Sequence, residues 1–242
     1  MEIMLFKDQS LKGYTLIEGF PGIGLVGPMA GSYLIEKLKM DYIGYLRSEM
    51  FPPIAAVHNG VPMFPARIYK NEEYKLVLFI AEFTIPAAAI RSISGELLAF
   101  ARKYGINRLV SVGGMPASKP TEDIFMVSND PSALKKVAKL GINPIDEGVV
   151  AGVSAELLVN SQALKLPVMD ILVEVDPSIT NPKYAELAIT GLNKLLDIDI
   201  DLSELDKEAK EVEEKIKEMM KKVKDSHEHY SGGEETGPSM YA

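Results

Sequence analysis

Three glycines, Gly22, Gly24 and Gly27, follow an apolar stretch at residues 14–20 and open a stretch with helical periodicity. Their spacing is that of the loop that binds the pyrophosphate of dinucleotides. In such a loop the glycines permit a tight turn, and the phosphates lie at the N-terminus of the helix, where backbone N–H groups are free. The pattern predicts a nucleotide- or small-ligand-binding loop, and an enzyme that uses it is one hypothesis.

Two features of the surrounding sequence argue against a nucleotide. Pro21 precedes the first glycine, and the next expected strand ends at Leu46-Arg47-Ser48 without an acid for the ribose hydroxyls. Asp41 begins that strand and is therefore at the wrong end for the ribose. The alternative interpretation is a strand-to-helix turn in which the glycines allow close packing.

Four charged residues, Glu18, Glu82, Arg91 and Glu156, are expected near ends of strands, where ligand crevices form in open α/β sheets. They could line such a crevice as acids or bases. Their spacing matches no known catalytic set, and Glu82, at the end of a buried strand, is better explained by hydrogen bonds to the backbone. The sequence therefore names no catalytic residue.

Histidine and cysteine usage disfavours metal and thiol chemistry. His58 falls at an expected hairpin turn, where a solvated polar side chain is typical, and the His227/His229 pair lacks further ligands. The chain has no cysteine, which excludes disulfides and thiol nucleophiles, and no serine stands in a G-x-S-x-G elbow. We expect no metal and no cofactor.

Composition and charge restrict the partners. The 242 residues are 47% hydrophobic and 25% charged, as in a globular protein with one large domain and an appendage. The net charge of −8 disfavours nucleic acid. No apolar run has membrane-spanning length, and the first residues have no signal-peptide pattern. These features, with the absence of cysteine, predict a cytoplasmic protein that does not bind membranes.

Residues 1–199 are expected to form one globular α/β domain in which strands alternate with helices. Residues 75–81 are nearly all apolar, which is typical of a strand covered on both faces, and Asn59-Gly60 indicates a hairpin and hence some antiparallel pairing. The order predicts a three-layer α/β/α sandwich with a mixed sheet. Strands are expected at 4–6, 14–20, 41–46, 54–57, 63–69, 75–81, 109–112, 124–127, 148–151 and 168–173. The segment 18–27 is expected to open a helix that runs to about residue 39, and further helices are expected at 86–104, 132–139, 152–161 and 181–196.

Residues 200–224 have the pattern of a charged heptad helix that Ser203 can cap. Apolar residues recur in alternating steps of three and four, a spacing that favours pairing with another helix, although the same face could pack on the parent domain. Acids concentrate in the first half and lysines in the second, which suits the helix dipole. The residues assigned to oligomerisation are Leu205, Val212, Ile216, Met219 and Val223.

Residues 225–242 form an acidic, polar stretch that we expect to be flexible, because it has too little apolar surface to offset its ordering entropy. It ends in Met240, Tyr241 and Ala242. A tyrosine ring, an apolar side chain and a free carboxylate on a flexible chain are suited to insertion into a partner's pocket, where a lysine can meet the carboxylate.

Three segments together resemble the proteasome assembly chaperone-2 family. They are Glu18-Gly-Phe-Pro-Gly-Ile-Gly-Leu-Val-Gly27, Ser111-Val-Gly-Gly114 and Gly152-Val-Ser-Ala-Glu-Leu-Leu158, within a region of similarity at about residues 10 to 200. With the C-terminal helix and the Met-Tyr-Ala ending, the chain resembles archaeal proteasome-assembling chaperone homologues of the B type.

The resemblance implies a homo-oligomeric α/β protein without established catalysis. It also implies binding to the α subunits of the 20S proteasome, because the ending resembles the hydrophobic–Tyr–any-residue motif with which proteasome activators dock on the α-ring. In this chain that motif falls on Met240, Tyr241 and Ala242. Whether such binding serves assembly or activation is left open by the sequence.

Overall fold

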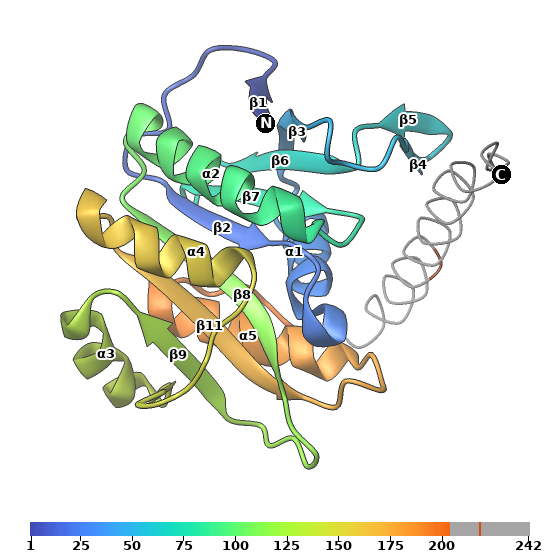
Figure 1. Ribbon diagram of the computed structural model, residues 1–242. Coiled ribbons are helices and arrows are strands. Elements are labelled where there is room, and N and C mark those ends of the chain that lie inside the picture. The colour runs from blue at the N-terminus through green and yellow to red at the C-terminus, as the bar shows by residue number, and fades with distance from the viewer. Residues whose placement is uncertain (204–217, 219–242) are drawn as a thin grey trace, which may run out of the picture.

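A nine-stranded mixed sheet forms the centre of the computed structural model, which describes residues 1–203 and residue 218 (Figure 1). The strand order is β1-β3-β6-β7-β2-β8-β11-β9-β10. The four central strands, β7 (Leu76–Ala81), β2 (Thr15–Gly19), β8 (Arg108–Pro116) and β11 (Val168–Val175), are parallel. The flanking strands are β1 (Glu2–Leu5), β3 (Asp41–Arg47), β6 (Ala66–Asn71), β9 (Ile124–Ser128) and β10 (Asn143–Pro144).

Helices cover both faces of the sheet, so the predicted three-layer α/β/α sandwich with a mixed sheet is confirmed (Figure 1). One face carries α1 (Val26–Lys37), α3 (Pro131–Val137) and α5 (Pro182–Leu196), and the other carries α2 (Ile90–Tyr104) and α4 (Val153–Asn160). Short 3-10 turns complete the chain at η1 (Ile23–Leu25), η2 (Ala87–Ala89), η3 (Ala138–Leu140) and η4 (Ser161–Leu164).

Side chains of the central strands alternate between two separate cores. Ile17, Val110 and Ile171 face α1 and α5, whereas Leu16 and Leu109 face α2 and α4. This alternation follows from the two-residue period of a strand. Because both faces are covered, β7 is buried along its whole length, which explains its continuous apolar sequence.

The Asn59-Gly60 hairpin is confirmed and forms a small sheet of its own, β4 (Ala56–His58) with β5 (Val61–Met63), which extends beyond the main sheet (Figure 1). Asn59 and Gly60 have φ of 50° and 78°, as a type I′ turn requires. The expected single strand at 63–69 is wrong: it is divided between β5 and β6, because the chain leaves the hairpin and joins the central sheet.

The strand expected at 148–151 is also wrong. The chain has no regular structure there, and Val149 is 98% exposed. The short β10 instead extends the sheet at this edge by pairing with β9.

Packing on the domain continues to Leu202. Ile200 is buried, and Leu202 packs against the α1/α5 core. The hydroxyl of Tyr33 donates to the carbonyl oxygen of Asp201 at 2.7 Å, and Lys37 forms a 3.0 Å ion pair with the Asp201 carboxylate. Leu202, an apolar residue within the predicted heptad helix of residues 200–224, therefore contacts its own domain.

The predicted oligomerisation residues, and the division of the chain at 199 and 224, are not tested by this structure. Leu205, Val212, Ile216, Met219 and Val223 lie outside the described residues, as do Met240, Tyr241 and Ala242. Within residues 1–203, no helix is long and apolar enough to cross a membrane.

Candidate functional site

The glycine loop, residues 21–27, joins β2 to α1 and fits tightly against neighbouring backbone. Gly24 has a φ of 69°, in the left-handed region. A Cβ atom on Gly27 would lie 2.9 Å from the carbonyl oxygens of both Phe20 and Val112. Glycine at position 27 therefore lets the start of α1 lie directly on the ends of β2 and β8.

The space beside this loop is filled by the protein itself. A Cβ atom on Gly24 would lie 3.0 Å from the side chain of Val175, and the carbonyl oxygen of Ile23 lies where a Cβ on Gly114 would be. Only Gly22 of the three motif glycines has no atom within 4 Å of such a position. Two strands, β6 and β7, separate β3 from β2, whereas a dinucleotide fold places its second strand beside the first. This geometry favours close packing over nucleotide binding.

Glu18, Ser111 and Asp170 lie side by side at the same register of β2, β8 and β11. All three are buried, on the sheet face that α2 and α4 cover. Glu18 Oε1 accepts a 2.8 Å hydrogen bond from the backbone N–H of Phe20. Burial raises the pKa of Glu18 to about 7, although the hydrogen bond from the Phe20 N–H and the nearby Ser111 hydroxyl favour the ionised form.

Asp170 has a still less favourable environment for a charge. Neither of its carboxylate oxygens has a hydrogen-bond partner of normal geometry among the described residues. Burial and the nearby Glu18 raise the pKa of Asp170 to about 7, and the Ser154 hydroxyl opposes this only in part. The sequence analysis did not select Asp170, although a charged residue within the apolar strand Val168–Val175 was the available signal.

Glu82 forms a second buried cluster, with Arg67 and His58. Its Oε1 accepts a hydrogen bond from Arg67 Nη2 and lies 2.7 Å from His58 Nε2. The Arg67 and Glu82 side chains are 3% and 12% exposed. Burial alone would raise the pKa of Glu82, but hydrogen bonds from His58 and Arg67 outweigh it and lower that pKa. The expected backbone partners of the Glu82 carboxylate are thus wrong. The His58 side chain is 39% exposed, as expected at a hairpin, but it also pairs with Glu82. The cluster attaches the β4–β5 hairpin to the end of β7.

Arg91 and Glu156 line a pocket of about 470 Å³ between the N-terminal ends of α2 and α4. Arg91 Nε lies 3.3 Å from Glu156 Oε1, and Arg91 is 89% exposed. The other lining residues are Ala87, Ala88, Ile90, Gly152 and Ala155, which provide no nucleophile or further acid. Glu18 and Glu82 are elsewhere, so the four charged candidates do not form one site. Within the described part of the chain, no three His, Cys, Asp or Glu side chains are placed to hold a metal ion.

These features define a class of protein: an α/β/α sandwich in which Gly24, Gly27 and Gly114 allow close packing and in which the buried acids do not form a catalytic set in the described residues. The chain belongs to the PAC2 family, whose model matches residues 16–220. The family part of the sequence-based resemblance is therefore confirmed.

Individual proteins and solved structures are similar to this chain. The chain is 27% identical over 190 residues to the uncharacterized protein MJ0106 of Methanocaldococcus jannaschii, with 78% of each chain covered. It is similar to the crystal structure of Pyrococcus furiosus PbaA, described as an archaeal homolog of proteasome-assembly chaperone. That match has a TM-score of 0.81 and 26% identity, over 93% of this chain and 100% of the other.

Pyrococcus furiosus PbaB, described as an archaeal proteasome activator, shares the fold. Its TM-score is 0.75, at 22% identity over 90% of this chain and 97% of that one. Because PbaA and PbaB both match this chain over 90% or more of its length, the assignment to the B type stays a prediction.

Proposed function

We propose that this chain is a non-enzymatic assembly chaperone or activator of the 20S proteasome, and that it binds the α-ring as a homo-oligomer. Membership of the PAC2 family is the observation that carries the proposal. The likeness to PbaA over the whole of that chain supports it. The absence of an assembled catalytic set among residues 1–203 is consistent with a binding protein. A cytoplasmic location belongs to the same proposal.

The binding element in this proposal is Met240-Tyr241-Ala242, the last three residues of the printed sequence. Met240 and the tyrosine ring would fill an apolar slot between α subunits, and the terminal carboxylate would meet a lysine there. Ordering of the preceding polar stretch opposes binding, so a single tail binds weakly. Several tails on one oligomer raise the effective concentration for each later tail, and avidity can add a factor of about 10²–10⁴.

A binding assay with purified 20S proteasome tests the proposal directly. Tyr241→Ala and removal of residues 240–242 should each abolish binding while leaving the oligomer and its thermal unfolding unchanged. Tyr230→Ala is the matched control, since it removes a tyrosine from the same polar stretch and should bind normally. Extension of the chain by Gly-Ser after Ala242 should also abolish binding, because it displaces the carboxylate. Undiminished binding by the truncated protein would reject the proposal.

Two assays then separate the two outcomes of binding. A chaperone should increase the yield of assembled rings from isolated α and β subunits, whereas an activator should increase peptide hydrolysis by preassembled 20S proteasome.

A further inference from the structure

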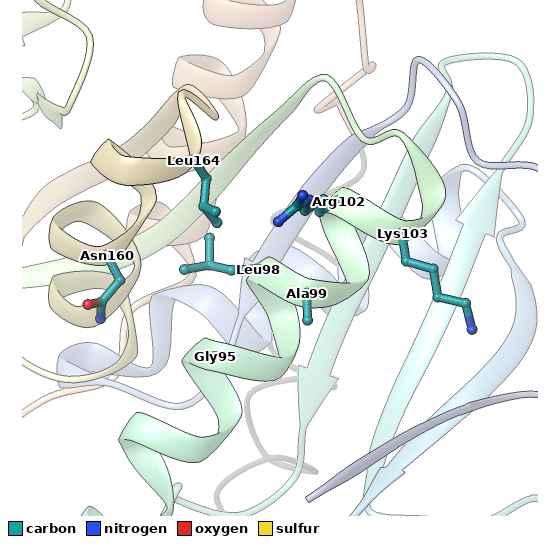
Figure 2. Close-up of a pocket in the computed structure, with 7 residues that line it drawn as sticks. All are labelled: Gly95, Leu98, Ala99, Arg102, Lys103, Asn160 and Leu164. Carbon is teal, nitrogen blue, oxygen red and sulfur yellow. The ribbon is translucent and has the colours of Figure 1, made fainter.

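A groove of about 610 Å³ lies between the C-terminal half of α2 and the end of α4, as Figure 2 shows. Gly95 and Ala99 are exposed one turn apart on α2. Because their side chains are absent or small, another segment can approach the backbone of α2 closely at these two positions. Leu98 and Leu164 add apolar surface, and Leu164 is 40% exposed. Arg102, Lys103 and Asn160 complete the lining.

The two cations of this groove have no acidic partner in the part of the chain that the structure describes. Among the described residues, neither Arg102 nor Lys103 forms an ion pair, and Lys103 lies over the ring of Tyr104 at 5.0 Å. Both residues are exposed in the last turn of α2. The groove therefore combines an apolar floor with two cations available for pairing, which suits an acidic amphipathic segment rather than a basic one.

One segment of this chain has that chemistry. Residues 204–216 contain six acids and three lysines around an apolar seam that includes Leu205, Val212 and Ile216. Asp206, Glu208 and Glu213 occupy heptad positions beside the seam, where charged side chains pair with the rim of a helical partner. An amphipathic helix that lays its apolar face into a groove is a recurring mode of recognition.

We propose that the α2/α4 groove of one copy receives residues 204–216 of a second copy. This inference rests on the homo-oligomer of the proposed function and assigns it a contact surface. The apolar seam would lie on Gly95, Ala99 and Leu164, and the acids beside it would pair with Arg102 and Lys103.

A second copy fits this groove better than the same copy does. The chain reaches Ser203 on the α1/α5 face, where Asp201 is held by Tyr33 and Lys37. The groove lies on the opposite face of the sheet. The step from Ser203 to Leu205 spans at most about 7 Å, so the start of the segment cannot pass around the sheet to its own groove. A neighbouring copy can present it without that constraint.

Charge reversal on the two sides of the contact tests the proposal. One full-length variant carries Arg102→Glu and Lys103→Glu in the groove, and another carries Asp206→Lys, Glu208→Lys and Glu213→Lys in the segment. Each should self-associate at least tenfold more weakly than the natural chain in sedimentation velocity. A mixture of the two should associate again, because the reversed groove of one meets the reversed segment of the other.

A steric variant tests the same contact without reversing any charge, so the test does not depend on correct folding of the charge-reversed proteins. Among the described residues, no atom outside the backbone of α2 and the two adjoining residues lies within 4 Å of a Cβ placed on Gly95. Gly95→Gln should therefore fold normally, keep or raise the melting temperature, and still prevent association by filling the groove. Lys135→Glu with Lys139→Glu, on the exposed surface of α3 and η3, is the matched control for charge and should associate like the natural chain.

Unchanged self-association of Gly95→Gln, or loss of association that the mixture does not restore, would overturn the proposal. Docking within one copy, or binding of some other acidic partner, would leave the sedimentation of all variants alike and would also overturn it. Truncation of residues 240–242 should leave self-association intact. Failure of this inference is therefore distinguishable from failure of the proteasome proposal, which is measured by α-ring binding.

Discussion

Glu18 and Asp170 lie at one register of the parallel sheet, on either side of Ser111, and point into the same α2/α4 core. Each carboxyl group is removed from solvent, and the pKa of each is raised to about 7, mainly by burial. For Asp170 the nearby Glu18 adds to this shift. At neutral pH the pair therefore holds protons that the unfolded chain would have released, so protonation and stability are linked.

The first prediction is that the free energy of unfolding falls as pH rises from 5 to 8.5. The pKa values of Glu18 and Asp170 are higher in the folded state than in the unfolded state. At a pH between the unfolded and the folded pKa values, the folded state therefore binds more protons than the unfolded state. The stabilising contribution is complete below the unfolded pKa values and is lost as pH rises through about 7. One pKa unit corresponds to about 1.4 kcal/mol, so the total change is on the order of several kcal/mol.

Urea unfolding monitored by circular dichroism at half-unit pH intervals measures this dependence. Carboxylates with a lowered pKa, such as Glu82, contribute in the opposite direction, but their contribution is lost only below about pH 4.5. The chosen window therefore excludes the titration of such carboxylates. Stability that is flat or rises toward pH 8.5 would contradict the prediction.

The second prediction concerns Asp170→Asn. The amide has nearly the same shape as the acid but cannot ionise, so it removes the destabilising charge at high pH. We expect the variant to be more stable than the natural chain at pH 8.5 by about 1–3 kcal/mol and to have a weaker dependence on pH. Asp146→Asn, at an exposed position, should behave like the natural chain. Lower stability of Asp170→Asn at pH 8.5 would show that the ionised Asp170 is favourably solvated.

The third prediction compares two glycines of one motif. Gly27→Ala should destabilise the domain by about 2–3 kcal/mol, because the new methyl group meets two carbonyl oxygens at 2.9 Å. Gly22→Ala should change stability by less than about 0.5 kcal/mol, since its φ is −137° and no atom lies near the added Cβ. Thermal unfolding of the two variants measures the difference. Equal effects of the two substitutions on stability would contradict the close contacts described for position 27.

Much of the fold follows from local sequence patterns. The apolar run in β7 requires cover on both faces, Asn59-Gly60 requires a left-handed turn, and Asn181 caps α5 just before Pro182. Each of these features depends on residues close together in the chain. Such signals therefore locate elements well even where they misplace a boundary, as at residues 63–69.

The clusters of charge are a different matter, because they depend on strand order. Glu18 lies close enough to raise the pKa of Asp170 only because β8 is the single strand between β2 and β11. Likewise, Arg67 reaches Glu82 because β6 pairs antiparallel with β7. No spacing along the chain indicates either contact. A charged residue within an apolar strand shows that a partner or a proton is needed there, but it does not identify which.

The fourth prediction is a double-mutant cycle on Arg67 and Glu82. Arg67→Leu leaves the Glu82 carboxylate buried without its main cation, and the expected loss is about 3–5 kcal/mol. Glu82→Leu should have a similar effect through Arg67. The double variant should lose far less than the sum of the two, because no unpaired charge remains. Urea unfolding at pH 7 gives the coupling energy, and additive effects within about 0.5 kcal/mol would contradict the interaction.

The fifth prediction separates the glycine loop from nucleotide chemistry. Because Val175 and the Ile23 carbonyl occupy the space beside Gly24 and Gly114, we expect neither ATP nor NAD to raise the melting temperature. A ligand present at 100 times its Kd would stabilise the protein by about 2.7 kcal/mol, which corresponds to roughly 5–10 °C for a domain of this size. Screening each nucleotide at 1 mM, with and without Mg²⁺, would therefore detect any Kd of about 10 μM or tighter. The contrary result would be a rise in melting temperature that the natural chain and Gly113→Ala both show and that a folded Gly27→Ala protein lacks. It would mean that the loop binds a nucleotide and that close packing does not fully explain its glycines.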